Sequence, residues 1–540
     1  MTTKAPSSPD RHAQPIPPPG ERRPELSRSS RRVWSLKAAG VALAGALSAV
    51  ALISCAPLDE LTGTKVDTVG QVRFENRLAI PPLADSELDA EGRRVFTLTA
   101  ESGEREFRPG ERTETWGFNG SYLGPTLRAS RGEEVMVGFE NGLDEATTVH
   151  WHGMHLPAAA DGGPHQMVEP GASWTPSWEI DQPAATLWYH PHPHGDTEEH
   201  VYRGLAGMFI LDDVEEAELD LPREYGVDDV PVIVQDKRFA DDGSLVEDER
   251  ERLGILGDTL LVNGTYGPYL DVSTERVRLR LLNGSTARTY DFGFSDQRDF
   301  DLIATDGGLL ERPAELDRIQ LSPGERAEIV VTMEPRERVV LRSYPPDLDP
   351  GSDTSREDGG EDSFDVLQLR AAAELDPSAA VPAELADIAE LDPADAAETR
   401  EFELRSDRIN GEEMDMDRID EVVEVDTSEV WEVENGHGRP HTFHVHDVQF
   451  QVLDVDGEDP PPELSGWKDT IQVPPRRQVR LIMAFEDYAD PDSPYMYHCH
   501  LLRHEDEGMM AQFVVVEPGE QASERPAHSE PGHNHAEDHG

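Results

Sequence analysis

The sequence predicts an all-β protein made of three β-sandwich domains, and an internal repeat is the main observation behind this prediction. Three segments of alternating apolar and polar residues each end in Asn-Gly, at Asn141, Asn283 and Asn435. Successive copies are 142 and 152 residues apart, and another Asn-Gly lies 20 to 25 residues before each of them. Alternation with period two is typical of half-buried strands, and a repeat of about 150 residues indicates copies of one domain rather than a solenoid.

Composition agrees with this fold class and narrows the range of partners. The 540 residues include 44 Gly and 42 Pro, which suit many short strands joined by turns. Asp and Glu number 109 against 48 Lys and Arg, so the formal net charge is −61. This charge argues against a nucleic-acid partner, because no positive field attracts phosphates. The acidic surface fits adaptation to high salt, and it fits general solubility in a chain encoded by a GC-rich genome equally well.

The first 54 residues have the features of an export signal. An Arg31-Arg32 pair precedes the apolar run 38–53, which is short for a membrane-spanning helix and suits a signal peptide. The pair resembles a twin-arginine signal, and Leu52-Ile53-Ser54-Cys55 resembles a bacterial lipobox. We therefore expect a lipid on Cys55 and a protein anchored on the outer face of a bacterial membrane, in the cell envelope. The alternative is an uncleaved N-terminal anchor, with the main body on the same side.

The repeat and the changes in composition divide the rest of the chain. We predict a linker at 55–66, three domains at 67–216, 217–371 and 401–518, a connector at 372–400 and a disordered tail at 519–540. The connector is rich in Ala, Pro and Glu, and the tail contains four His that either bind metal weakly or have no role. We expect the protein to be a monomer.

Histidine pairs occur at equivalent positions of the first and last domains. Nine and eleven residues after the repeated Asn, these domains carry His-x-His and the middle domain carries Phe-x-Phe: His150 and His152, His444 and His446, and Phe292 and Phe294. A second pair follows in the outer domains only: His190 and His192, and His498 and His500. Residues i and i+2 of a strand point to the same side. Eight imidazoles suit three metal ions at the interface of these two domains, and copper, zinc and iron all fit such ligands.

Cys499 narrows the choice of metal. It is the only cysteine besides Cys55, so it has no intrachain disulfide partner once Cys55 carries a lipid. His441, His504 and Met509 accompany it, and two imidazoles, a thiolate and a weak axial thioether are the ligands of an electron-transfer blue copper site. Because Cys499 stands between His498 and His500 in a strand, a short covalent path leads from its sulfur to the imidazoles on the opposite face.

Four motifs together resemble those of the multicopper oxidases, in the three-domain laccase-like group. They are His150-Trp151-His152-Gly153, Tyr189-His190-Pro191-His192-Pro193-His194-Gly195, His441-Thr442-Phe443-His444-Val445-His446, and His498-Cys499-His500 continuing through His504 to Met509. Gly466-Trp467-Lys468-Asp469-Thr470 is a supporting match. The resemblance covers most of residues 70–517 and implies three cupredoxin-like Greek-key β-sandwiches with four copper ions.

The resemblance also implies a role for each motif residue. Type 1 copper would be bound by His441, Cys499 and His504, with Met509 axial. Type 2 copper would be bound by His150 and His444, and the type 3 pair by His152, His190, His192, His446, His498 and His500. Asp161 resembles the acid that guides protons and water near type 2 copper, and Glu505 resembles the proton donor toward the type 3 pair. The alternative for both is an ordinary surface carboxylate.

By this resemblance, the chain couples one-electron oxidation of phenolic or similar reductants to reduction of O2 to water. A metal-ion oxidase for Cu⁺, Mn²⁺ or Fe²⁺ that confers copper tolerance is an alternative. Residues 347–365 are acidic rather than Met-rich, which lowers the case for a dedicated cuprous oxidase. A non-catalytic copper-binding protein of the envelope is the third possibility.

Overall fold

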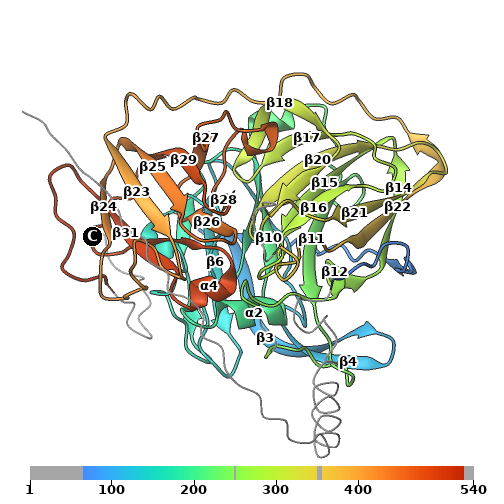
Figure 1. The fold of residues 1–540 in the computed structure, drawn as a ribbon, viewed down its shortest axis with the longest axis horizontal. Helices are drawn as coiled ribbons and strands as arrows, with labels where there is room; N and C mark the ends of the chain where they lie inside the picture. The colour runs from blue at the N-terminus through green and yellow to red at the C-terminus, as the bar shows by residue number, and fades with distance from the viewer. Residues whose placement is uncertain (1–64, 249–250, 349–354, 528–540) are drawn as a thin grey trace, which may run out of the picture. The chain divides into compact units, whose positions relative to one another are not determined.

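The computed structural model describes residues 65–248, 251–348 and 355–527. The predicted signal, Cys55, most of the linker and the last thirteen residues of the tail lie outside these ranges. Within the described residues, strands predominate and form six sheets (Figure 1). None of the helices in this part of the chain is long and apolar enough to cross a membrane. The all-β prediction is therefore confirmed, and the sheets are paired in three modules.

The first module has one sheet of six strands and one of three. The larger sheet contains β2 (Glu87–Leu88), β3 (Arg94–Arg108), β4 (Glu111–Phe118), β6 (Glu134–Asn141), β7 (Ser173–Trp174) and β8 (Ser177–Glu179). The smaller contains β5 (Leu127–Ser130), β9 (Ala185–Tyr189) and β10 (Gly207–Asp212), and the helical segments are η2 (Ala158–Ala160), α2 (Thr197–Arg203) and α3 (Val214–Ala217). Side chains of both sheets, such as Phe139 and Phe209, pack in one buried core.

The middle module has sheets of six and seven strands. The first contains β1 (Asn76–Arg77), β14 (Pro268–Thr274), β16 (Tyr290–Phe294), β19 (Ile319–Leu321), β21 (Arg338–Tyr344) and β22 (Phe364–Asp376). The second contains β11 (Asp229–Lys237), β12 (Thr259–Val262), β13 (Thr265–Tyr266), β15 (Arg276–Asn283), β17 (Phe300–Thr305), β18 (Gly308–Leu316) and β20 (Arg326–Thr332). Phe292 and Phe294 are buried in the core between the sheets. Strand β1 precedes the first module in sequence but pairs in parallel with β14.

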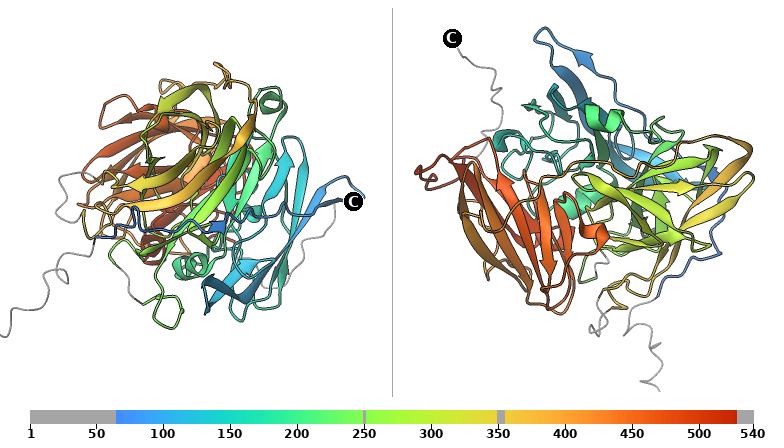
Figure 2. Two further views of the ribbon diagram at one scale, coloured as in Figure 1. Left: turned by 90° about the vertical axis from the view of Figure 1, so that its right-hand side faces the viewer. Right: turned by 90° about the horizontal axis from the view of Figure 1, so that it is seen from above.

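The third module has sheets of four and five strands. They are formed by β23 (Glu398–Leu404), β25 (Thr427–Asn435), β27 (Phe450–Val455) and β29 (Gln478–Phe485), and by β24 (Glu421–Glu424), β26 (His441–Val445), β28 (Thr470–Val473), β30 (Tyr495–Cys499) and β31 (Met510–Val516). The helical segments are η3 (Pro462–Leu464) and α4 (Leu502–Asp506). The segment between β22 and β23 has no strand and runs over the outside of the middle and third modules (Figure 1). Figure 2 gives two further views of the modules.

The three repeated asparagines make the same hydrogen bonds in all three modules. Each side-chain Nδ2 of Asn141, Asn283 and Asn435 donates to two backbone carbonyls at 2.8–2.9 Å, one of them four or five residues ahead. Each Oδ1 accepts from the backbone N–H two residues ahead. Because the asparagine fixes the turn, it also fixes the direction of the next segment, which carries the first histidine pair in the outer modules.

A buried polar network around two arginines of the middle module reaches Glu216 and Thr186 of the first module. Arg280 on β15 donates to both carboxylate oxygens of Asp229 at 2.7 and 3.1 Å, and its Nη1 donates to Thr186 Oγ1 on β9 at 2.8 Å. Arg278 pairs with Glu216 and Glu328 beside it. The apolar side chains of Trp188 and neighbouring residues fill the rest of this contact.

Candidate metal centre

The twelve predicted ligands are all buried, and eleven of them gather in groups within the described residues. His150, His152, His190, His192, His441, His444, His446, His498, Cys499, His500, His504 and Met509 are each at most 3% exposed. Four groups of three have ligand atoms within 4.8 Å of one another: His150, His152 and His444; His152, His190 and His500; His192, His446 and His498; and His441, Cys499 and His504. A fifth group adds the carboxylate of Asp161 to His150 and His446.

Strand pairing explains why the histidine pairs meet. In the third module, β26 and β30 are antiparallel neighbours, and His444 stands opposite His498. In the first module, His150 and His190 form an isolated antiparallel bridge. Because i and i+2 side chains share one face, each of these pairings presents four imidazoles on one side. The two faces meet each other, so every imidazole group combines residues of the first and third modules.

Two imidazole groups have closely opposed nitrogens. The Nε2 atoms of His192 and His446 each lie 3.2 Å from Nε2 of His498. In the second group, His190 Nε2 lies 3.4 Å from Nδ1 of His152. The opposed nitrogens in each group lie this close together, yet they cannot all be paired by hydrogen bonds with one another. A cation between them would accept their lone pairs.

His150 and His444 form a third site. Their Nδ1–H groups donate to the backbone carbonyls of Asp161 and Asp469, at 2.9 and 2.8 Å. A carbonyl only accepts, so the hydrogen sits on Nδ1 and the lone pair on Nε2. Both Nε2 atoms are buried without a hydrogen-bond partner. A buried lone pair without a donor is an incomplete site that a metal ion completes.

Burial keeps these imidazoles in the form that binds metal. It lowers the pKa of His192 and His500 to about 3, and it lowers the pKa of His152, His190, His441, His444 and His446 well below the ordinary value. Neutral imidazole is the ligand form, so no proton has to be displaced near neutral pH. The donor set and its protonation state therefore fit soft or borderline metal ions such as copper.

The cysteine site is separate from the imidazole groups. Cys499 Sγ lies 3.5 Å from Nδ1 of His441 and 3.7 Å from Nδ1 of His504. Burial raises the pKa of the Cys499 thiol to about 12, so the thiolate form requires a cation beside it. Met509 is buried next to this group, and its carbonyl accepts from the Cys499 N–H at 3.0 Å. The four residues fit the ligand set of an electron-transfer copper site.

The two predicted carboxylates lie against the imidazole groups. Asp161 Oδ2 accepts from His446 Nδ1–H at 2.8 Å. Glu505 sits between His192 and His498, with its oxygens 3.3 and 3.2 Å from their Nδ1 atoms. Each carboxylate is 1% exposed, unlike an ordinary surface acid. The nearest polar atoms given for the Glu505 oxygens are these two ring nitrogens, and Asp161 Oδ1 has no hydrogen-bond partner among the described residues.

Several site residues were missed by the sequence analysis. The loop residues Arg252 and Asp407 border His504, whose Nε2 lies 3.0 Å from the Arg252 carbonyl and 3.7 Å from a carboxylate oxygen of Asp407. Asp469 and Thr470 contact His152 and His444. The only signal for the second pair was the motif Gly466–Thr470, which matched the family without a role attached to it. The loop residues had no signal, because only tertiary structure brings them to His504.

Sequence and structure comparisons agree with this geometry. Multicopper oxidase domain models match residues 99–216, 240–343 and 382–519. The chain is 37% identical over 448 residues to multicopper oxidase mco of Staphylococcus haemolyticus, covering 82% of this chain and 93% of that protein. It is 37% identical over 451 residues to cell division protein FtsP of Dickeya dadantii, with 82% and 93% covered. A crystal structure of laccase from Pediococcus acidilactici matches with a TM-score of 0.76 and 36% identity, covering 85% of this chain and 97% of that one.

The matches include all three modules, and the laccase structure confirms that they are cupredoxin-like β-sandwiches. Copper is the metal that this family uses, and the buried donor sets described above fit it. The chain therefore belongs to the multicopper oxidase family.

Proposed function

We propose that the protein is a laccase-like oxidase that couples one-electron oxidation of phenolic or similar reductants to the four-electron reduction of O2. In this proposal, four copper ions would be bound: type 1 by His441, Cys499, His504 and Met509, type 2 by His150 and His444, and a type 3 pair by the other six histidines. The observation that carries it is the combination of one cysteine site and three buried imidazole sites with nitrogens free for metal. Copper in these sites would supply one-electron oxidation at Cys499 and reduction of O2 to water at the imidazoles.

The backbone of β30 provides the route between the two sites. Cys499 is flanked by His498 and His500, which belong to different imidazole groups. Only one peptide bond therefore separates Cys499 from each of these two histidines. Phe443 stands opposite Cys499 and His444 opposite His498, so β26 holds this segment in register.

The two carboxylates account for the protons that the reaction consumes. Reduction of O2 to two waters takes four protons, and buried acids beside the site are suited to deliver them. Glu505 holds its oxygens against Nδ1 of His192 and His498, on the side of each ring away from the shared Nε2 position. Asp161 keeps Oδ1 free while Oδ2 orients His446.

In this proposal, the reductant binds at the edge of His504 and donates its electron there. His504 Nε2 faces away from Cys499, toward Asp407, whose side chain is 40% exposed. A carboxylate at this edge accepts a hydrogen bond from a phenol hydroxyl, and the oxidised phenol can leave its proton there. The same carboxylate attracts cations, which favours the metal-ion oxidase as the second candidate.

A non-catalytic role is a third candidate because cell division protein FtsP is among the relatives. Eleven of the twelve ligands gather in buried donor groups and Met509 is buried as well, which argues against it for this chain.

An oxygen-electrode assay with a panel of donors distinguishes these candidates. We expect copper-loaded protein to consume O2 when phenols are supplied. Uptake with Cu⁺, Mn²⁺ or Fe²⁺ alone would instead identify a metal-ion oxidase. Full copper content without uptake from any donor would leave a copper-binding protein and contradict the proposal.

Replacing Met509 by Leu tests the axial position. We expect Met509→Leu to keep the blue colour and to raise or preserve the reduction potential of the cysteine site, because a weak donor to the oxidised metal is lost. Redox titration of the blue absorption band measures this potential. A clear fall in the potential would mean that Met509 is not the axial ligand.

A further inference from the structure

Two stacked imidazole pairs line the interface of the outer modules, and one aspartate holds each pair. The rings of His150 and His446 stack with centroids 3.9 Å apart. Asp161 of the first module joins them: its backbone carbonyl accepts from His150 Nδ1–H at 2.9 Å, and its carboxylate accepts from His446 Nδ1–H at 2.8 Å.

Asp469 of the third module repeats this arrangement with the other pair. The rings of His152 and His444 stack with centroids 3.7 Å apart and planes 7° from parallel. The Asp469 carbonyl accepts from His444 Nδ1–H at 2.8 Å, and its Oδ1 accepts from His152 Nε2–H at 3.1 Å. Thr470 Oγ1 lies 3.0 Å from His152 Nε2 and 3.1 Å from His444 Nδ1, and its hydroxyl donates to Asp469 Oδ1. Asp469 is thus the counterpart of Asp161.

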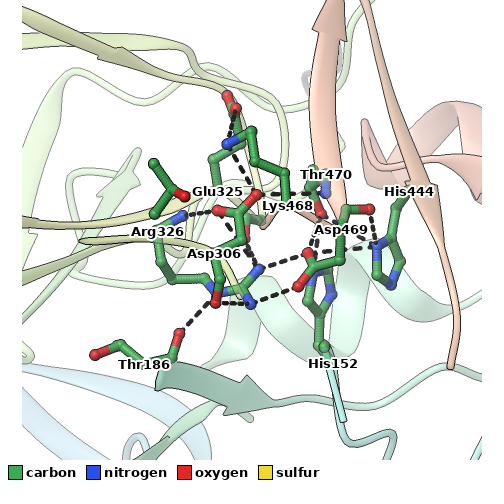
Figure 3. Close-up of polar contacts among 12 residues, drawn as sticks. His152, Thr186, Asp306, Glu325, Arg326, His444, Lys468, Asp469 and Thr470 are labelled. Carbon is green, nitrogen blue, oxygen red and sulfur yellow. Dashed lines mark hydrogen bonds and ion pairs between the residues drawn. The ribbon is translucent and has the colours of Figure 1, made fainter. Parts of the chain in front are cut away.

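The two aspartates differ in what else binds them. Asp161 leaves Oδ1 without a hydrogen-bond partner. Both oxygens of Asp469 accept from Arg326, at 2.7 Å from Nη1 and 2.6 Å from Nη2 (Figure 3). A bidentate pair of this kind fixes the plane and the rotation of the carboxylate. Asp161 is free to accept water or a proton, whereas Asp469 is locked.

Every N–H group of the Arg326 guanidinium donates a hydrogen bond. Besides the two bonds to Asp469, its Nε donates to the Thr186 carbonyl at 2.9 Å, Nη1 to the Gly324 carbonyl at 3.1 Å and Nη2 to the Asp306 carbonyl at 3.0 Å. All five guanidinium N–H groups are therefore used, and lysine cannot reproduce this fork. Arg326 begins β20 of the middle module, which supplies none of the twelve ligands.

The surroundings of Arg326 hold it in place. Asp306 Oδ1 accepts from its backbone N–H at 2.7 Å, and Asp306 Oδ2 lies 2.9 Å from Lys468 Nζ. A carboxylate oxygen of Glu325 lies 3.1 Å from the same Lys468 Nζ (Figure 3). Lys468 directly precedes Asp469 in the third module. These two adjacent residues therefore form ion pairs with three residues of the middle module, Asp306, Glu325 and Arg326.

The same turn of the middle module touches a further ligand. Gly324 has φ +87°, and a Cβ at this position would lie 3.0–3.1 Å from ring atoms of His500. Both the positive φ and the close approach favour glycine. The turn 322–326 therefore contacts one histidine directly and two others through Asp469.

We propose that Arg326 is a positioning residue through which the middle module, which has no ligands of its own, completes the imidazole cluster. The inference rests on the proposed function. By locking Asp469, Arg326 keeps hydrogen on His152 Nε2 and leaves the Nδ1 lone pair toward Nε2 of His190, 3.4 Å away. Partners of this kind fix the tautomer and the orientation of a metal ligand, and their loss costs about 10–100-fold in metal affinity.

Arg326→Lys tests this role, with Arg280→Lys as the matched control. Both arginines are fully buried in the middle module and bind an aspartate with two bonds. Asp469, the partner of Arg326, accepts from His152, whereas no histidine of the described cluster is bonded to Asp229, the partner of Arg280. We expect both variants to lose stability. Only Arg326→Lys should bind the imidazole-site copper about 10–100-fold more weakly in chelator competition, with an altered type 2 electron paramagnetic resonance signal. The blue band of the cysteine site should be unchanged in both.

Copper binding, measured by chelator resistance and by the resonance signal, tests the role of Arg326 independently of enzyme activity. Equal chelator resistance and equal resonance signals in Arg326→Lys, Arg280→Lys and the unmodified chain would overturn the inference while leaving the proposed function intact. Absence of imidazole-site copper from the unmodified chain would overturn both. If Arg326→Lys does not fold, Thr470→Val removes the hydroxyl that links the two histidines to Asp469, and Thr470→Ser retains it. Weaker copper binding in Thr470→Val alone supports the network, and equal binding in both overturns it.

Discussion

Cys499→Ser is expected to abolish the blue colour and the oxidation of reductants while the three modules remain folded. Cys499 supplies the only sulfur anion of its site, and a serine hydroxyl does not replace a thiolate as a copper ligand. The substitution also breaks the route into His498 and His500. We expect turnover to fall by about 1,000-fold or more, equivalent to about 4 kcal/mol in activation free energy. Visible absorption and oxygen uptake measure the two losses.

Thr442→Ser is a suitable control for Cys499→Ser. Thr442 is buried in β26 next to His441, and the change removes only a methyl group. It should retain colour and turnover. Copper analysis of Cys499→Ser should still find metal at the imidazoles, since none of these residues is replaced. Substantial oxidation of reductants by Cys499→Ser would contradict the route through β30.

Glu505→Gln is expected to slow O2 reduction by about 10²–10⁴-fold, the usual contribution of a positioned proton donor. The amide has nearly the same size as the carboxylic acid but cannot release a proton. Copper binding and the blue colour should persist, because Glu505 is not among the proposed ligands. In stopped-flow experiments, donors should bleach the blue band at the normal rate, and O2 should restore it slowly.

Glu507→Gln is the matched control for this prediction. Glu507 lies two residues further along the chain, is 44% exposed and pairs with Arg503 on the surface. Its loss should leave both half-reactions unchanged. Unchanged reoxidation in Glu505→Gln would exclude the proton-donor role. Slow bleaching together with normal reoxidation would assign Glu505 to the cysteine site instead.

The histidine pairs could be predicted from the sequence because the geometry within each pair is local. In a strand, alternation alone sets His444 and His446 on one side, and the repeat in the first domain indicates which surfaces face each other. The direction of each ring could not be predicted in this way. It depends on hydrogen bonds between distant residues, such as the bond from His152 to Asp469, 317 positions away.

Two long-range contacts in the fold were not predicted from the sequence, because each joins residues that are far apart in the chain. Strand β1 is only two residues long, and no repeat or motif links it to β14, 192 residues later. Arg326 resembled any other arginine in an alternating strand, because only the folded chain brings its guanidinium to Asp469. By contrast, residue type alone distinguishes Phe292 and Phe294 of the middle domain from the histidine pairs at the equivalent positions, and both lie in the apolar core.

The sharing of every imidazole group between the first and third modules constrains the order of events during synthesis. His150, His152, His190 and His192 emerge from the ribosome long before their partners on β26 and β30. A growing chain that ends before His441 holds at most two of the three residues of each imidazole group, and none of the sulfur site. A nascent chain that ends before His441 therefore has no complete group in which to sequester copper, and the group of His441, Cys499 and His504 is complete only once His504 has been added.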